Sequence, residues 1–304
     1  MAAIVVVHGI GNQYLGARTL HSGIAPALLD GVRAAHPEGP SLGPEDIEVA
    51  FYGNLFRPAG TTAVKGGPEP DPREPMDPYD VELLLAWWAE AARIEPDRVP
   101  PLTTDLTSKA PTPRLAQQAL HALARSRFLA RSGDRFLLGV LRQVRRYLTE
   151  PDVRARVQAT VAAAVGPDTR VLVGHSLGSV VAYEALAAHP EWPVRALVTL
   201  GSPLGIPHLV LDRLDPPPKD GRGRWPGTIE RWTNLCDRRD VVALVKTLGP
   251  VFDDAHRHVH DVLVDNGWQA HAIAHHLTAA ETGAAITAGL PPQDRPQDLP
   301  EGGR

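Results

Sequence analysis

The stretch RVLVGHSLGSVVAYEALAAH, residues 170–189, joins a short apolar run to an amphipathic run through a turn that holds one serine between two glycines. The first run has the composition of a buried strand, and the second has the apolar spacing of a helix. A serine in such a turn lies at the carboxyl end of the strand, where the start of the helix offers free backbone N–H groups. The stretch predicts a strand–turn–helix unit, in which Ser176 is either a nucleophile or the cap of an ordinary helix.

Short runs rich in valine, leucine and isoleucine recur along the chain and alternate with helical patterns. The runs are nearly continuously apolar rather than alternating, as expected of strands that are buried on both faces of a parallel sheet. The alternation predicts an α/β fold with a mostly parallel central sheet flanked by helices. The predicted strands are Ala3–Val7, Ile47–Tyr52, Arg170–Val173, Ala196–Leu200, Glu230–Leu235 and Val259–Val264. The predicted helices are Leu20–Ala35, Val153–Val165, Ser179–Ala188 and Leu277–Ala288.

Residues 58–150 interrupt this alternation. Residues 58–113 hold 11 of the 30 prolines, too many for central strands or long helices. A helix is predicted at 77–93, and one or two helices at 114–148, where an apolar stripe recurs. Because the segment lacks a balanced core pattern of its own, we interpret it as a helical cap inserted into a single sheet domain that spans 1–288.

Two details complete this domain organisation. The helix predicted at 77–93 has an apolar face of Leu84, Trp87 and Trp88. We expect both tryptophans in the core, and a place in the wall of a substrate pocket under the cap is the alternative. Residues 289–304 include the sequence LPPQDRPQDLPEGGR, which is too polar to bury apolar surface and is predicted to be disordered.

Composition excludes several classes of protein. The 304 residues include 31 basic and 35 acidic side chains, a balance that argues against a dedicated nucleic-acid binder. The single cysteine, Cys236, excludes an internal disulfide and a site with several cysteine ligands. The apolar start lacks the basic residues and the cleavage site of a signal peptide, and no apolar run approaches the length of a membrane span. We therefore expect a cytoplasmic protein.

The turn Gly174-His175-Ser176-Leu177-Gly178 matches the G-x-S-x-G pattern in the required place, between a strand and a helix. Glycine is needed two positions on either side of the serine because larger side chains would collide with neighbouring elements. The sharp turn predicts strained backbone angles at Ser176 and a hydroxyl exposed at the edge of the sheet. A neutral hydroxyl is a poor nucleophile, so a base, an orienting acid and donors for the oxyanion must come from elsewhere in the chain.

A second glycine-rich turn, HGIGNQ at residues 8–13, follows the first predicted strand. With the turn at Ser176 it resembles the α/β-hydrolase superfamily, and within it the lipase-like serine esterases. The resemblance covers residues 1–57 and 151–288, and it implies a fold that lacks the first antiparallel strands of the full superfamily fold. It also implies that Gly9 belongs to the oxyanion turn and that the backbone N–H groups of Ile10 and Leu177 hold the oxyanion. The alternative, a phosphate loop, is disfavoured because Tyr14 stands where a dinucleotide-binding loop requires glycine.

The superfamily places the triad in the chain order serine, acid, histidine. The acid is expected in a D-x-V turn just past the strand at 230–235, where Asp240 fits better than the alternative, Asp237. The histidine is expected after a small residue and before the final helix, which matches His271; His275, one helical turn further on, is a possible partner for it. Aspartate would hold the imidazole in the correct tautomer, and the imidazole would take the proton of Ser176.

The resemblance implies a serine hydrolase that cleaves carboxylic esters through an acyl-enzyme, needs no cofactor and acts on a small-molecule or lipid ester. A serine peptidase, a thioesterase and a catalytically silent interaction protein on the same scaffold are the alternatives.

A zinc site is a further alternative because His256, His258 and His260 alternate along the chain and His271 and His275 are four residues apart. The chain lacks a carboxylate-rich partner set for them, so we expect a run of histidines at the edge of the sheet and no metal.

Arginines are concentrated in the predicted cap, and between 125 and 146 only Asp134 opposes them. The ordinary interpretation is the solvated face of an amphipathic helix. Contact with an anionic lipid surface or an acidic partner is the alternative. The arginines are Arg125, Arg127, Arg131, Arg135, Arg142, Arg145 and Arg146.

Overall fold

The computed structural model describes residues 2–57, 76–102, 113–127 and 134–291. At its centre lies a six-stranded sheet with the strand order β2-β1-β3-β4-β5-β6, and every neighbouring pair is parallel. The α/β class with a parallel sheet, predicted from the apolar runs, is therefore confirmed. The strands are β1 (Ile4–Val7), β2 (Ile47–Ala50), β3 (Val171–His175), β4 (Ala196–Leu200), β5 (Arg231–Asp237) and β6 (Val259–Val264).

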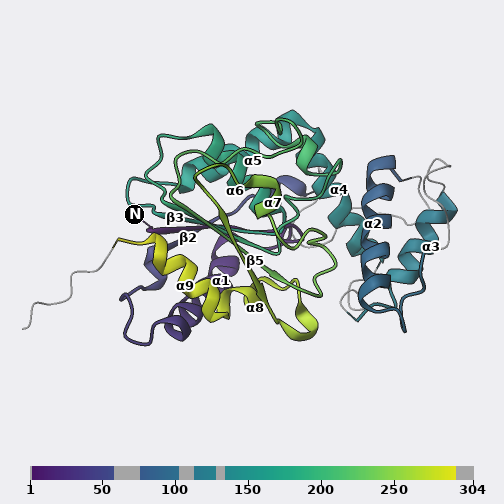
Figure 1. The fold of residues 1–304 in the computed structure, drawn as a ribbon, viewed down its shortest axis with the longest axis horizontal. Helices are drawn as coiled ribbons and strands as arrows, with labels where there is room; N and C mark the ends of the chain where they lie inside the picture. The colour runs from purple at the N-terminus through teal and green to yellow at the C-terminus, as the bar shows by residue number, and fades with distance from the viewer. Residues whose placement is uncertain (1, 58–75, 103–112, 128–133, 292–304) are drawn as a thin grey trace, which may run out of the picture.

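Helices cover both faces of the sheet (Figure 1). On one face lie α1 (Ala17–Ala35), α8 (Ile273–Thr278) and α9 (Ala280–Gly289), and on the other lie α5 (Pro151–Ala164) and α6 (Leu177–Ala188). Successive strand residues point to opposite faces, so Val6 belongs to one apolar cluster and Val5 to the other. This double burial explains why the central strands β1, β3 and β4 are apolar at nearly every position instead of alternating.

The helix predicted at Leu277–Ala288 is wrong in its extent, because two helices occupy this region. They meet at Ala279, whose backbone is extended with φ −67° and ψ 135°. Both pack on α1 at very short range: a Cβ atom on Gly31 would lie 2.1 Å from the Leu277 carbonyl oxygen, and one on Gly283 would lie 2.0 Å from the Gly31 carbonyl oxygen. The break turns the chain so that α8 and α9 both reach α1.

Three more helices lie beyond the carboxyl ends of the strands (Figure 1): α2 (Pro78–Ile94), α3 (Pro113–Leu123) and α4 (Asp134–Thr149). Helix α2 starts where the Asp77 carboxylate accepts a hydrogen bond from the Tyr79 N–H at 2.9 Å and where Pro78 takes the first helical position. The described residues of the region predicted as one or two helices form α3 and α4. Their buried side chains and those on the α5–α6 face of the sheet form one continuous apolar cluster.

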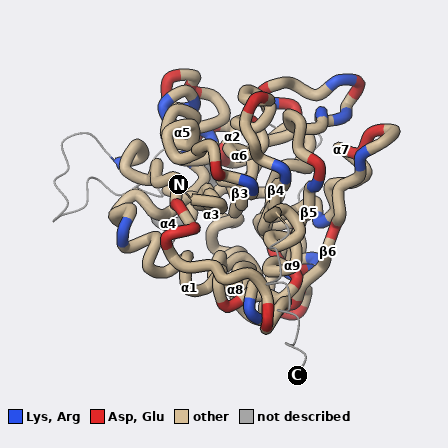
Figure 2. The backbone as a smooth tube through the Cα atoms, turned by 90° about the vertical axis from the view of Figure 1, so that its left-hand side faces the viewer, with Lys and Arg blue, Asp and Glu red and all other residues tan. Residues whose placement is uncertain are grey.

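Acidic and basic residues are interspersed over the face shown in Figure 2. Three of the arginines in the predicted charged set contact acidic side chains: Arg145 binds Asp80, Arg146 binds Glu150, and Arg127 lies near Glu95. Arg131, the side chain of Arg135 and residues 292–304 of the predicted tail lie outside the described part of the chain. None of the helices in the described part is long and apolar enough to cross a membrane.

The contact between α1 and the C-terminal helices generates a stability prediction. Gly31→Ala forces a Cβ atom against a carbonyl of α8, and we expect it to lower the free energy of unfolding by about 1–3 kcal/mol or more. A Cβ atom on Gly23, in the same helix, would have no neighbour within 4 Å, so Gly23→Ala should raise that free energy by about 0.5–1 kcal/mol. Urea denaturation of both variants tests this. Equal effects would show that α1 does not pack closely at Gly31.

Candidate active site

The candidate site lies at the carboxyl edge of the sheet, between β1 and β3. The chain passes from β1 outward to β2 and later returns to β3 on the other side of β1. In open parallel sheets, ligands bind in the crevice outside the carboxyl ends of strands at such a reversal. The turn after β1, residues 8–13, and the turn after β3, at Ser176, both open onto this crevice.

Ser176 has left-handed backbone angles, φ 53° and ψ −128°, as the sharp turn predicted. The flanking glycines show why side chains are excluded: a Cβ atom on Gly174 would lie 2.6 Å from the Ser179 Cα, and one on Gly178 would lie 2.1 Å from the Val7 carbonyl oxygen. The Ser176 N–H donates to the Leu200 carbonyl at 2.9 Å, which ties the turn to the end of β4. Its side chain makes no capping hydrogen bond to α6. Ser176 therefore occupies the N-cap position of α6 without capping the helix through its hydroxyl.

The Ser176 hydroxyl instead lies beside His271. The distance from Ser176 Oγ to His271 Nε2 is 3.0 Å, and His271 Nδ1 lies 2.7 Å from Asp240 Oδ2. A carboxylate only accepts hydrogen bonds, so Nδ1 carries the proton and Nε2 is left to accept from the serine hydroxyl. The structure thus brings together the three residues that the chain order singled out.

Asp240 is fully buried, and its environment keeps it ionised. Burial alone would raise its pKa, but the electrostatic interaction and hydrogen bond with His271 and the hydrogen bond from the Val242 N–H outweigh burial and hold the pKa below its ordinary value. The Val242 and Ala243 N–H groups donate to Oδ1 at 2.9 and 3.2 Å, which fixes the plane of the carboxylate. A buried carboxylate held in this way orients the imidazole without needing contact with substrate.

Asp237, the alternative acid, has a different place. Its carboxylate accepts hydrogen bonds from the N–H groups of Arg239, at 2.7 Å, and of Asn266. These bonds shape the turn that leads from β5 to Asp240 and tie it to the segment that precedes His271. The structure does not bring Asp237 into hydrogen bonding with His271.

Gly201 is a site residue that the sequence reasoning missed. It follows β4 with φ +54°, and a Cβ atom there would lie 2.8 Å from Asp240 Oδ2 and 3.0 Å from His271 Nδ1. Any side chain at this position would enter the hydrogen bond between acid and base. The signal in the sequence was a glycine directly after a predicted strand. The steric need for that glycine becomes visible only where Asp240 and His271 meet in the folded chain.

The predicted oxyanion donors, Ile10 and Leu177, both line the cavity beside Ser176. Within the described part of the chain, neither backbone N–H donates to a protein acceptor. The Gly9 carbonyl accepts from His8 Nδ1 and from Asn12 Nδ2, the latter at 3.0 Å. Because C=O and N–H point in opposite directions across a trans peptide, holding this carbonyl turns the Ile10 N–H the other way. Two free donors are what a developing oxyanion requires.

His8 holds the Gly9 carbonyl as a neutral ring. Burial lowers its pKa to about 4, and its Nε2 accepts from the Tyr52 N–H at 3.2 Å, which leaves the proton on Nδ1. The glycine itself is required by close contact: a Cβ atom on Gly9 would lie 3.0 Å from the Ser176 Cβ. The close approach of Ser176 therefore requires a glycine at position 9 in the first turn.

Two further histidines, His175 and His276, lie near His271. The predicted partner, His275, is exposed instead. His175 Nε2 donates to the His271 carbonyl at 2.9 Å and so holds the backbone of the base. His276 is fully buried beside His175, with ring centroids 6.1 Å apart. Neither nitrogen of His276 has a hydrogen-bond partner in the described part of the chain.

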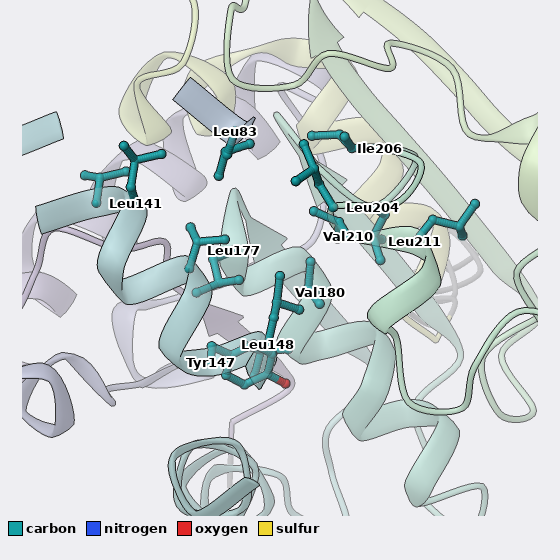
Figure 3. Packing of buried hydrophobic residues seen from close by; sticks show 14 of the residues in the cluster. Leu83, Leu141, Tyr147, Leu148, Leu177, Val180, Leu204, Ile206, Val210 and Leu211 are labelled. Atoms are coloured by element: carbon teal, nitrogen blue, oxygen red, sulfur yellow. The ribbon is translucent and has the colours of Figure 1, made fainter. Parts of the chain in front are cut away.

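Ser176 and His271 open onto a cavity of about 970 Å³. Most of its wall is apolar and comes from α2, α4 and the segments that follow β4 and β5. In Figure 3 the side chains of Leu83, Leu177 and Ile206, all lining residues, face a common space. Trp87 belongs to this wall as well as to the buried core, whereas Trp88 packs in the core and donates its indole N–H to the Pro100 carbonyl at 2.8 Å.

The run of alternating histidines lies away from this cavity. His258 Nδ1 lies 3.1 Å from Asp253 Oδ2, and His260 is exposed on β6. In the part of the chain that the structure describes, no group of three or more histidine, cysteine or acidic residues is arranged to hold a metal ion. No family model, curated protein or solved structure matches the chain.

The buried His276 generates a prediction about pH. Burial lowers its pKa to about 4, so the unfolded chain binds more protons between about pH 4 and 6.5. Its contribution to stability is therefore fully present above pH 6.5 and is lost as the pH falls. We expect His276→Leu to remove about 2 kcal/mol of the decrease in the free energy of unfolding between roughly pH 8 and pH 5.

Urea denaturation at both pH values measures this difference. His275→Leu, the same change at the exposed neighbour, controls for removing a histidine from α8. An acid-induced loss of stability that is identical in His276→Leu and the unaltered chain would contradict the prediction.

Proposed function

We propose that the protein is a serine hydrolase that cleaves carboxylic esters on a fold of the α/β-hydrolase type. The observation that carries the proposal is the series of hydrogen bonds from Asp240 through His271 to Ser176. Beside it lie the backbone N–H groups of Ile10 and Leu177, which donate to no acceptor among the described residues. Such a series on a strand–turn–helix element supplies nucleophile, base, orienting acid and oxyanion donors together.

In the acylation step, Ser176 Oγ attacks the carbonyl carbon of the ester while its proton passes to His271 Nε2. The carbonyl oxygen becomes an oxyanion, which accepts hydrogen bonds from the N–H groups of Ile10 and Leu177. The tetrahedral intermediate then collapses: the bond to the leaving oxygen breaks, and His271 returns the proton to that oxygen. Asp240 stabilises the imidazolium between the two transfers without accepting its proton.

In the deacylation step, a water molecule takes the place of the alcohol. His271 Nε2 accepts a proton from the water as its oxygen attacks the acyl carbon, and the same two N–H groups hold the second oxyanion. Cleavage of the bond to Ser176 Oγ releases the carboxylic acid and returns the proton to the serine. The Ser176 hydroxyl and the His271 ring are thereby restored, so the cycle needs no cofactor.

The cavity supports an ester with an apolar acyl group. Helices α2 and α4 contribute Leu83, Trp87, Leu137, Val140 and Val144 to its wall, which is the position expected of a helical cap over the nucleophile. Burial of an acyl chain contributes roughly 0.8 kcal/mol per methylene to binding. A thioester would fit the same site, and the choice between ester, thioester and peptide is made by assay with each class.

We expect Ser176→Ala to lower kcat by about six orders of magnitude, because the hydroxyl is the attacking atom. The assay is hydrolysis of p-nitrophenyl esters of increasing chain length, together with labelling by a fluorophosphonate probe. Ser22→Ala, at an exposed serine of α1, is the control and should label like the unaltered protein. Near-normal turnover or labelling in Ser176→Ala would refute the proposed nucleophile.

The two aspartates provide a matched pair. Asp240→Asn should lower kcat by about four orders of magnitude, because an amide no longer specifies the productive tautomer of His271. Asp237→Asn weakens a turn instead, so it should lower the melting temperature. Its kcat should remain at least about 100-fold higher than that of Asp240→Asn. Kinetics and thermal unfolding of both variants decide the assignment. The reverse order of kcat values would make Asp237 the acid.

A further inference from the structure

The mouth of the cavity carries two arginines that the proposed reaction does not use. Arg98 and Arg127 both line the cavity, and each side chain is 46% exposed. Both lie near one carboxylate, that of Glu95, at 3.9 and 4.0 Å. Of the described residues that line the cavity, the only acidic one is Asp240, which is buried and hydrogen-bonded to His271. The mouth therefore has an excess of positive charge.

Glu95 accepts no hydrogen bond from either guanidinium group. Its carboxylate accepts short hydrogen bonds from the Ser126 hydroxyl, at 2.6 Å, and from the Arg127 backbone N–H, at 3.0 Å. The two guanidinium groups are too distant from it for hydrogen bonds. Arg98 Nε donates to the Arg125 carbonyl at 3.2 Å, and no hydrogen bond leads from the Arg127 guanidinium to the described part of the chain.

Arg127 also contacts the turn that precedes the catalytic base in the chain. Its guanidinium carbon lies 4.5 Å from the centre of the Trp268 ring, a distance typical of a cation–π contact. Trp268 belongs to the short 3-10 turn Gly267–Gln269, directly before the segment that holds His271. Arg127 therefore lies on the side of the cavity from which His271 acts.

The chemistry of the reaction then decides which part of a substrate meets the arginines. His271 gives its proton to the leaving oxygen, so the alcohol part of the ester must lie on the His271 side of Ser176. The acyl part is left with the apolar wall of α2 and α4. From this we infer that the substrates are esters of an apolar acid with an alcohol that carries an anionic group, a carboxylate or a phosphate, bound by Arg98 and Arg127. This inference rests on the proposed hydrolase activity.

Matched substrates test the anion site. One pair is p-nitrophenyl octanoate and the octanoyl ester of a hydroxynitrobenzoate, which adds a carboxylate to the leaving group. The other pair is octanoylglycerol and octanoylglycerol phosphate, followed by release of octanoate. We expect the unaltered protein to prefer the charged member of at least one pair, and the pair that shows the preference identifies carboxylate or phosphate as the anion.

The double variant Arg98→Gln/Arg127→Gln should lower the charged-to-neutral ratio of kcat/KM about 10-fold or more, mainly through KM, as expected for lost charge-assisted hydrogen bonds. Arg127→Lys keeps the charge and should retain most of the preference. Arg127→Glu should favour octanoylcholine, whose alcohol is cationic. In the unaltered protein, about 1 M salt should reduce the preference.

Arg195→Gln is the matched control. This arginine is 45% exposed and is paired with Glu230, but it precedes β4 at the opposite, amino-terminal edge of the sheet. It should leave both ratios unchanged. The anion site alone is overturned if the double variant unfolds normally, labels with fluorophosphonate and keeps its charged-to-neutral ratio of kcat/KM within about threefold of that of the unaltered protein. If the unaltered protein neither labels at Ser176 nor hydrolyses any ester, the proposed function itself fails.

Discussion

Ser176 adopts its left-handed backbone because several chain segments converge at its turn with no room for side chains. The ends of β1, β3 and β4 meet there, and the glycines at 9, 174 and 178 each face another part of the backbone or the serine at closer than ordinary contact distance. A hydrogen bond from the serine N–H to the end of β4 completes the turn. Strain of this kind, which costs on the order of 1–3 kcal/mol, persists only where the surrounding structure enforces it. Here the enforced conformation directs the hydroxyl toward His271.

Burial sets the electrostatics around that hydroxyl. His8, His175 and His276 are buried, and burial lowers the pKa of each, so they remain neutral. Their ring nitrogens are then available to hold carbonyl groups: His8 holds that of Gly9, and His175 holds that of His271. Asp240 is buried and yet ionised, because His271 and two backbone N–H groups compensate its charge. Charge in the proposed mechanism is thereby concentrated on one carboxylate and one imidazole.

The helices beyond the carboxyl ends of the strands form the part of the cavity that would select the substrate of the proposed reaction. Helices α2 and α4 supply apolar side chains to the cavity, and the same helices share a continuous core with one face of the sheet. The cavity wall is therefore part of the folded core. At its mouth, Arg127 packs on the turn that leads to His271. In the proposed reaction, this places the anion-binding groups beside the leaving group and the apolar wall beside the acyl chain.

The local sequence by itself determined the six strands and the turn at Ser176. The acid and the histidine came from the chain order that the family resemblance implies, and the choice between Asp240 and Asp237 stayed open. The strands and the turn depend on short-range pattern: mainly apolar runs, and glycines at fixed spacing around the serine. Only the tertiary structure decided that the final helix breaks at Ala279, that Gly201 and His175 support the acid and the base, and that Arg98 and Arg127 converge at the mouth of the cavity. These features arise from contacts between residues far apart in the chain. Such contacts leave no periodic signal, because steric exclusion and charge pairing act between segments that only the folded sheet and helices bring together.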